Sequence, residues 1–341
     1  MIKIEYIPNS VQYLEMSDER YFSKEFSNCI SNSKLSLINP DQGGSVEKYL
    51  AGFKPNYSNG MFLGSAVHEL ILQPKDFKLS DNTTRPSAKL GFVADILYKK
   101  YKKTTVLPTT EEVKEACIKV DYYSKSLTDS RINNVLDQCI PYLRSRYEEE
   151  MNPEYLNVES IFLDIRNYET CMQCVSSLRL NYNIMNLLYP AGSKVMNEAA
   201  LFIDFKATDT ETGKSTILRI KGKLDNFTVN TDKRSLVLND LKTSGHPLEY
   251  FKHSFKEYHY ARQMGLYAFM LKEYIAKYHN ITDINSFKAN MLVVSTVSEC
   301  NSGIYEVYDA DIVNGFQEFI KLLKMAAEVE LNKIQDGDLD T

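Results

Sequence analysis

Long apolar runs are missing from this sequence. No stretch approaches the roughly 18–20 apolar residues that a helix needs to cross a bilayer, which excludes a membrane-spanning helix. The first residues, MIKIEYIPNS, also lack a basic region followed by an apolar core, so they predict no signal peptide. We therefore expect a soluble protein that works in the cytoplasm and has no membrane partner.

Cysteine is scarce, tryptophan is absent, and neither sign of charge dominates. Six cysteines scattered over 341 residues exclude the disulfide scaffold of a small secreted protein. The formal net charge of −5 excludes a protein that coats nucleic acid through basicity alone, although it allows a basic groove beside an acidic site. With no tryptophan present, the 23 tyrosines are expected to serve mostly as core and surface residues.

What the sequence does contain is a change of periodicity near residue 190. Helical spacing of apolar residues falls at 60–72, 87–103, 110–126, 129–150 and 166–188. Later patterns predict strands at 198–206, 215–229, 235–242, 289–297 and 303–308, and helices at 248–279 and 310–333. We expect an α/β fold in which residues 1–190 form a mainly helical part, 191–335 form the core and 336–341 form an acidic tail. No repeat or low-complexity linker separates these parts, which favours one compact unit.

Chemistry is first suggested by a short acidic-x-Lys pattern. Four triplets have it: Asp76-Phe77-Lys78, Glu112-Val113-Lys114, Asp204-Phe205-Lys206 and Asp240-Leu241-Lys242. The first is expected in a loop and the second in a charged helix, where neither setting fixes a carboxylate beside an amine. The last two are expected in strands, where the two-residue period places the acid and the lysine on one face. Strand context therefore selects two of the four triplets.

The two remaining triplets differ in whether a second carboxylate is available in the preceding strand. Asp225 stands fifteen residues before Asp240, at the end of the preceding predicted strand. A hairpin between the two strands would bring both carboxylates together, and paired carboxylates are what a hard cation such as Mg²⁺ requires. Asp204 has no matching acid in a preceding strand. We therefore expect Asp225, Asp240 and Lys242 to form an active site.

Other candidate residues lie on either side of this group. Tyr260, Gln263 and Tyr267 share one face of the helix that follows, although the same spacing also fits an ordinary amphipathic helix with tyrosines in its core. Upstream, His68 follows Gly64 by one helical turn and is either a core histidine or an added metal ligand. Glu198 begins the first predicted strand and is either a plain strand-end carboxylate or part of the metal site.

Taken in order, these residues resemble a known family. The set Gly64-x-x-x-His68, Asp225, Asp240-x-Lys242 and Gln263-x-x-x-Tyr267 is similar to the motifs of the RecB-like branch of PD-(D/E)XK nucleases, and most of all to RecE-type exonucleases of the exodeoxyribonuclease VIII kind. The similarity covers roughly residues 30–75 and 195–270. Lys223 stands where the family often has arginine.

The resemblance implies a restriction-endonuclease-like core, with a central mixed sheet flanked by helices. It also implies hydrolysis of DNA with Mg²⁺, or Mn²⁺ in its place, held by Asp225, Asp240, the Leu241 carbonyl and His68. Lys242 would orient the attacking water, with Glu198 as a further water-orienting group, and Gln263 and Tyr267 would steady Lys242 or the DNA strand. An iron–sulfur cluster is not expected, because relatives that hold one have three cysteines after the core, whereas here only Cys300 follows Gln263. The lone pair Cys171-x-x-Cys174 is expected to be structural.

The implied activity is 5′→3′ digestion of linear double-stranded DNA from its ends, leaving 3′ single strands for phage-type recombination. A single-strand annealing protein and a ring-shaped homo-oligomer are the implied partners, in the cytoplasm of a bacterial host. Two alternatives stay open: an endonuclease of structure-specific or restriction type, and a catalytically silent DNA-binding or assembly protein on the same fold.

Basic clusters could line a DNA path. Lysines at 99–103 are expected mainly on a solvated helix face, whereas those at 214–223 lie beside Asp225 in the sequence. We expect Lys221, Lys223 and the ring of Tyr260 to contact DNA.

Overall fold

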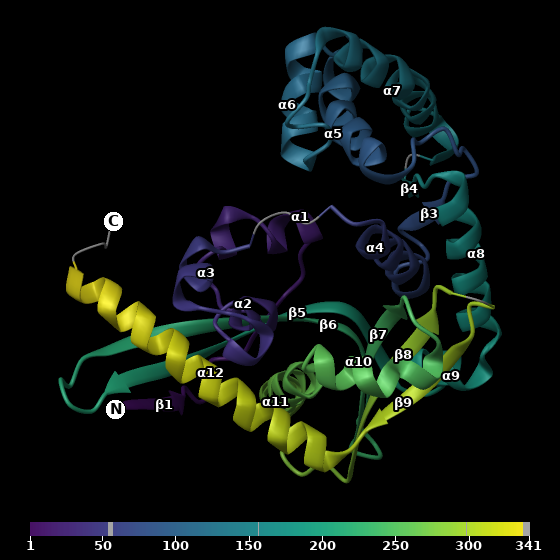
Figure 1. The fold of residues 1–341 in the computed structure, drawn as a ribbon. Helices are drawn as coiled ribbons and strands as arrows, with labels where there is room; N and C mark the ends of the chain where they lie inside the picture. Colours follow the sequence, from purple (N-terminus) through teal and green to yellow (C-terminus); the bar gives the residue numbers. More distant parts are fainter. Residues whose placement is uncertain (54–56, 156, 298, 337–341) are drawn as a thin grey trace.

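A mixed seven-stranded sheet forms the centre of the protein. The computed structural model describes residues 1–53, 57–155, 157–297 and 299–336 (Figure 1). The sheet order is β1-β5-β6-β7-β8-β9, with β2 also paired to β5. Its strands are β1 (Ile2–Tyr6), β2 (Gln12–Leu14), β5 (Lys194–Asp209), β6 (Ser215–Asn230), β7 (Ser235–Ser244), β8 (Ser286–Ser295) and β9 (Ser302–Val307). Among the described strands of this sheet β7 and β8 pair parallel and the other pairs are antiparallel, so the predicted α/β class and mixed sheet are confirmed.

The first residues of the chain form two strands that were not among the predicted segments. β1 and β2 both pair antiparallel with β5 and extend the sheet at its edge. In β1 the more buried Ile2, Ile4 and Tyr6 alternate with exposed Lys3 and Glu5, which is the pattern of a strand with one face on the core. Five residues of alternation are too short to stand out in a sequence dominated by helical spacing.

The helices match the predicted segments closely from residue 59 onward, with two interruptions, and three short helices before it lie outside those segments. They are α1 (Asp18–Tyr21), α2 (Asn32–Ser36), α3 (Val46–Ala51), α4 (Asn59–Leu72), α5 (Ala88–Thr104), α6 (Thr110–Val120), α7 (Asp129–Glu150), α8 (Ile165–Leu180), α9 (Tyr182–Leu188), α10 (Phe251–Glu257), α11 (Tyr260–His279) and α12 (Asp309–Asp336). The predicted helix at 248–279 breaks between α10 and α11, where His259 has φ of 52°. The predicted helix at 166–188 breaks at Asn181, which ends α8 and caps α9.

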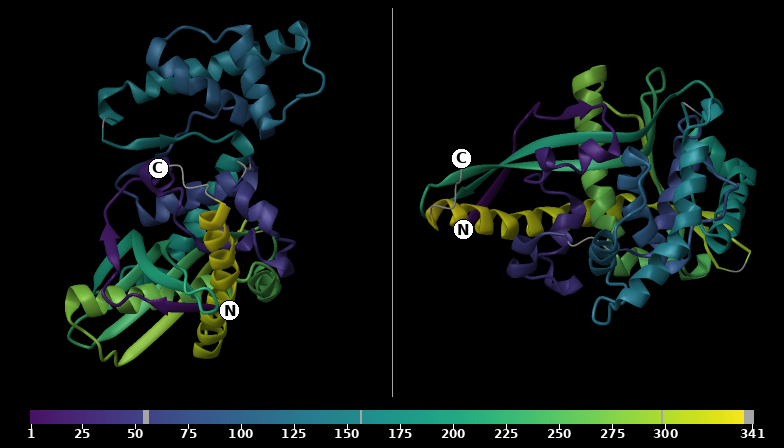
Figure 2. Two further views of the ribbon diagram at one scale, coloured as in Figure 1. Left: turned by 90° about the vertical axis from the view of Figure 1, so that its left-hand side faces the viewer. Right: turned by 90° about the horizontal axis from the view of Figure 1, so that it is seen from above.

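Helices cover both faces of the sheet. On one face, α11 and α12 pack on apolar side chains such as Leu238 and Met291. On the other, α4, α8 and α9 pack on Leu241 and Leu292. The long β5–β6 hairpin, with β1 paired to its end, extends beyond β7, β8 and β9 alongside α12 (Figures 1 and 2). This three-layer arrangement leaves α4 and α11 on opposite sides of β7.

Helices α5, α6 and α7 form a separate lobe with its own hydrophobic core, which stands above α4 in Figure 1. A short parallel pair, β3 (Phe77–Leu79) with β4 (Glu159–Ile161), lies at its base. The fully buried Arg85 joins the lobe to the rest of the chain: its guanidinium donates to Asp95 at 2.7 Å and lies 4.5 Å from the ring of Phe62 on α4. The lobe is therefore tied to the layer that carries the predicted site.

Among the described residues, no helix is both long and apolar enough to cross a membrane. All six cysteines are buried and unbridged. Cys171 and Cys174 lie in the core between α4 and α8, where burial raises the pKa of both thiols above the usual range for cysteine. The last five residues of the predicted acidic tail, 337–341, lie outside the described residues.

Candidate active site

The site lies where β6 and β7 separate. The pairing of these strands runs from Asn230 opposite Ser235 to Asn226 opposite Asn239. Beyond that point β7 continues beside β8 as far as Ser244, whereas β6 continues beside β5. Asp225 is therefore the first β6 residue past the fork, and its Oδ2 accepts a hydrogen bond of 2.8 Å from the Leu241 N–H across the opening.

The alternation of β5 and β6 also breaks at this point. In β6, Ile220 and Leu224 face the α11 side, but after Asp225 the odd-numbered Phe227 and Val229 do so. The register between the strands places Glu198 opposite Asp225, because Asn197 pairs with Asn226 and Ala199 with Leu224. Glu198 has φ of 52°, in the left-handed region that a residue with a Cβ seldom adopts. A local backbone distortion thus turns Glu198 and Asp225 into the opening.

A row of asparagines backs the acidic residues. Asn290 donates to Asn239 at 2.9 Å, Asn239 to Asn226 at 2.8 Å, and Asn226 to Asn197 at 2.7 Å, so the chain crosses β8, β7, β6 and β5. Asn226 and Asn239 are fully buried and also donate to backbone carbonyls of α9. Because buried amides must be satisfied, this row fixes the strands against one another immediately beside the residues that carry the chemistry.

Asp240 and Lys242 project from β7 on its α11 side. Lys242 Nζ lies 2.5 Å from Asp240 Oδ2, and Gln263 of α11 donates to Asp240 Oδ1 at 2.8 Å. Burial raises the pKa of Asp240 to about 6, against the opposing effect of Lys242. Burial would lower the pKa of Lys242, but the carboxylates of Asp240 and Asp225 outweigh it and hold that pKa above its ordinary value. Lys242 is therefore a cation fixed between two acids.

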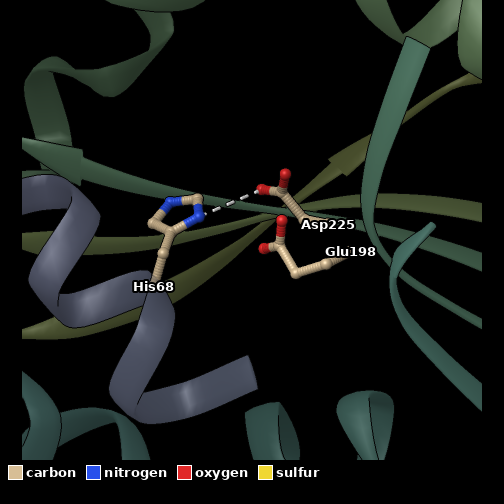
Figure 3. Close-up of side chains that lie close together, drawn as sticks. All are labelled: His68, Glu198 and Asp225. Carbon is tan, nitrogen blue, oxygen red and sulfur yellow. Dashed lines mark ion pairs between the residues drawn. The ribbon is translucent and has the colours of Figure 1, made fainter. Parts of the chain in front are cut away.

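His68 reaches the same place from α4. Its Nδ1 lies 3.6 Å from Asp225 Oδ2, longer than a hydrogen bond, and Figure 3 shows the ring pointing at that carboxylate with Glu198 beside it. Burial and the nearby Lys242 lower the pKa of His68 to about 4, so the imidazole is neutral at pH 7. Gly64, one turn earlier, lets α4 approach β7: a Cβ there would lie 2.9 Å from Thr243 Oγ1. This contact gives a reason for a glycine at position 64.

Within the described part of the chain, one group of three donors could hold a metal ion. His68, Glu198 and Asp225 each offer an atom within 4.8 Å of the others. Burial, followed by the charge of Asp225, raises the pKa of Glu198 to about 7, and burial also raises the pKa of Asp225. Asp240, predicted as a ligand, lies outside this group, because its two oxygens face Gln263 and Lys242. The Leu241 backbone faces both Asp225 and His68.

Two acidic residues at the site were missed from the sequence. Asp18, which begins α1, forms an ion pair with Lys223, and Lys223 also pairs with Glu198. Glu69 follows His68, and burial together with the charge of Glu159 raises its pKa to about 7. Because Glu69 directly follows His68 in the sequence, its presence at the site could have been suspected. Nothing near Asp18 in the sequence linked it to the distant strands.

The predicted supporting residues take different places. Gln263 contacts Asp240 rather than Lys242, and the hydroxyl of the nearly buried Tyr267 interacts with Gln263. The ring of Tyr260 lies 5.6 Å from Lys242 Nζ. Lys223 is held by Glu198 and Asp18 as described above.

The lysines of the predicted DNA path lie in different surroundings. Lys221 is only 8% exposed, and its Nζ donates to the Tyr21 carbonyl at 2.9 Å and lies over the Tyr21 ring. Lys221 is therefore covered by α1 and offers little surface to DNA, and its contact with DNA stays a prediction. Among the lysines at 99–103, Lys100 pairs with Glu112 and Lys102 with Glu150, which fits a solvated helix face.

These side chains open into a cleft of about 880 Å³. Its walls come from α4, β7, α10 and the start of α11. His68, Glu198, Lys223 and Lys242 lie on its surface, so a substrate could reach them. A second cleft of about 740 Å³ shares Glu69, Glu198 and Lys223 with the first, so the acidic group lies where the two meet.

Comparison with known proteins gives little guidance. No protein-family model matches the chain, and no curated protein matches it. A crystal structure of a candidate exonuclease from Eubacterium rectale is similar over 96% of this chain and 89% of that one, with 13% sequence identity and a TM-score of 0.43. Similarity at this level defines neither a family nor an activity, so the residues of the cleft must carry the functional assignment.

Proposed function

We propose that the protein is a metal-dependent nuclease that hydrolyses phosphodiester bonds in DNA. The observation that carries this proposal is the convergence of His68, Glu198, Asp225, Asp240 and Lys242 at one accessible fork in the sheet. Buried acids beside a fixed lysine and a neutral imidazole are costly to assemble, and such groups cluster at catalytic sites.

The donor set fits a divalent cation. Carboxylate oxygens suit Mg²⁺ and Mn²⁺, and an imidazole nitrogen is compatible with Mn²⁺ and other transition metals. His68, Glu198 and Asp225 would hold the ion, and burial leaves both carboxylates with pKa values above their ordinary range, a cost that a cation would relieve. Asp240 and the Leu241 carbonyl remain predicted donors. When bound, the cation supplies positive charge to the phosphate and lowers the pKa of water.

The remaining residues position the reacting groups. Lys242 holds the attacking water by hydrogen bonding and contributes charge near the phosphate, since its ammonium is fixed 2.5 Å from Asp240. Gln263 keeps Asp240 in place through its hydrogen bond, and Tyr267 steadies Gln263. Tyr260, beside Lys242, limits the space open to water on the α11 side.

The finer assignment follows the motif resemblance. We propose 5′→3′ exonuclease activity on linear double-stranded DNA with Mg²⁺, leaving 3′ single strands for phage-type recombination. A single-strand annealing protein and further copies of the chain, assembled as a ring, are the proposed partners. The support for these details is the ordered set of motifs from Gly64 to Tyr267.

End-labelled linear and covalently closed circular duplexes, each with Mg²⁺ or with EDTA, test the proposal. We expect the linear duplex to be degraded from its 5′ ends only with Mg²⁺, while the circle survives. Cutting of the circle would replace the exonuclease by the endonuclease alternative. No hydrolysis of either DNA with Mg²⁺ or Mn²⁺ would leave the catalytically silent DNA-binding alternative.

A further inference from the structure

The segment that follows Lys242 forms one rim of the cleft. At the end of β7, Ser244 Oγ accepts a hydrogen bond from the His246 N–H at 3.1 Å and donates to the His246 carbonyl at 3.0 Å. The Ser244 carbonyl accepts two more from Thr296, at 2.8 Å from its N–H and 3.2 Å from its hydroxyl. The turn therefore follows the same strand as Lys242 and is fixed at Ser244, two residues after it.

Helix α10 is anchored by one face. Phe251, Ser254 and Phe255, at the spacing of one helical turn, are buried. The ring of Phe251 stacks on Tyr260 at 5.9 Å, and the ring of Phe255 lies 4.9 Å from Tyr305 of β9. Because this face holds the helix on the protein, the opposite face is free to serve another purpose.

A short row of aromatic rings runs from the turn after β7 to His253 on that opposite face of α10. His246 and Tyr250 have ring centroids 4.9 Å apart, and Tyr250 and His253 are stacked at 4.7 Å with an angle of 20° between the rings. All three side chains are exposed, and Tyr250 keeps 46% of its surface. His246 lines the cleft, so the row, called here the ring row, leads from the cleft to the outer surface. Its stacking orders three exposed rings that the core does not need, and the π faces left for a ligand are those at the two ends of the row.

Charge contributes little to this rim. Lys252 and Lys256 are exposed on α10, but the exposed Glu249 and Glu257 on the same segment offset them. A segment without net positive charge would attract a phosphate backbone weakly, and its binding would show little dependence on salt. Ordered exposed rings without excess positive charge instead suit flat, uncharged groups. Nucleobases are such groups, since each base presents a π face that stacks on an aromatic side chain.

We propose that the ring row of His246, Tyr250 and His253 binds unpaired nucleobases of the strand that enters the cleft. This inference rests on the proposed function, because it places the bases beside a phosphate held near Lys242. Bases paired in a duplex stack on one another, so only a strand that has separated near the cut presents a free face to the rings. The substrate class at this site is therefore DNA with unpaired bases next to the bond that is cut.

Fluorescence anisotropy tests the ring row directly. The full chain is titrated in EDTA, where no cleavage occurs, against a short fluorescein-labelled single strand at low and at high salt. We expect Tyr250→Ala and His253→Ala each to weaken binding about tenfold. The loss should be nearly the same at both salt concentrations. Tyr250→Phe keeps the ring and should bind like the parent, as should Tyr182→Ala, which removes a tyrosine that is 79% exposed and does not line the cleft.

Cleavage of matched substrates provides the second measurement. With Mg²⁺, Tyr250→Ala should raise KM for a duplex that has unpaired bases at its end while changing kcat little. Parent-like binding and KM in Tyr250→Ala and His253→Ala would overturn the ring row and leave the nuclease proposal intact. Ring-dependent binding by a parent chain that cuts nothing would support the ring row and overturn the nuclease. A parent that neither binds nor cuts would overturn both.

Discussion

Two strands of this protein carry the same short motif in different surroundings. Asp204-Phe205-Lys206 lies in β5 and Asp240-Leu241-Lys242 in β7, and each strand places the acid and the lysine on one face. The side chain of Asp204 is 18% exposed and pairs with Arg219 at 2.9 Å. The side chain of Asp240 is 1% exposed and faces its own Lys242.

The difference shows that position in the sheet, rather than the motif, makes the site. The β5 triplet lies within an unbroken antiparallel ladder, and Asp204 stands directly opposite Arg219 in its register. The β7 triplet lies past the fork from β6, with α4 on one side and α11 on the other. A pair that is open to water contributes little, because solvent and salt screen it. Charges at the fork are shielded from water and interact more strongly.

Removal of the acid from each triplet should produce the largest contrast. Asp240→Asn keeps the shape and the contact with Gln263 but loses the charge beside Lys242, so Mg²⁺-dependent hydrolysis should fall about 1000-fold or more. Asp204→Asn should keep nearly full activity. Initial rates on linear duplex DNA measure both, with circular dichroism to show that each variant is folded. Equal loss in the two variants would contradict the assignment.

The lysines give the second contrast. Lys242→Gln removes the ammonium that is held between Asp240 and Asp225, and we expect a loss of about 100-fold or more in kcat. Lys206→Gln changes an exposed residue and should leave kcat unaltered. A Lys242→Gln variant with normal kcat would show that another group orients the water.

Much of the fold was predictable because its signals are local. The helical spacing before residue 190 and the alternating strands after it follow from burial of one face of each element, and most boundaries agree within a few residues. The placement of Asp225, Asp240 and Gln263 together was also predictable, since a hairpin and the helix that follows it bring near neighbours in sequence into contact.

What could not be predicted depends on distant contacts. Asp18 reaches the site only because β2 pairs with β5 and brings the N-terminal segment over it. The break in alternation at Glu198 depends on a backbone conformation that its residue type disfavours. The asparagine row from Asn197 to Asn290 joins four strands, and single asparagines in separate strands give no sign of it.

Substitution of the residues that contact Asp240 and Asp204 should give a smaller difference in activity. Gln263→Leu removes the hydrogen bond to Asp240 Oδ1 inside a buried site, where a bond to a charged group contributes about 1.5–3 kcal/mol. We expect a loss of about tenfold or more in kcat/KM. Arg219→Gln removes the partner of Asp204 on a more exposed strand and should leave kcat/KM unchanged. If both variants lose activity alike, Gln263 acts through general stability and not through Asp240.

The smallest effect concerns Glu198 and pH. The pKa of Glu198 is raised to about 7 by burial and by Asp225, whereas the pKa of glutamate in an unfolded chain is about 4.3. Between these values the folded protein holds more protons than the unfolded one, so the contribution of Glu198 to stability is full at low pH and is lost as pH rises through about 7. Glu198→Gln cannot titrate. In EDTA, its Tm relative to the parent should therefore rise by a few degrees between about pH 5 and pH 8.

Two comparisons separate the effect of Glu198 on Tm from the effects of other groups. His68, whose pKa is lowered to about 4, changes stability in the opposite sense below about pH 6.5, but it is present in both proteins and largely cancels in the difference. Mg²⁺ should raise the Tm of the parent more than that of Glu198→Gln at about pH 8, because at a given concentration a ligand of the folded state stabilises it more when it binds more tightly. A Tm difference that stays constant with pH would contradict the raised pKa, whereas an equal response to Mg²⁺ would remove Glu198 from the metal site. The two outcomes are independent, so the experiment separates the electrostatic role of Glu198 from its role as a ligand.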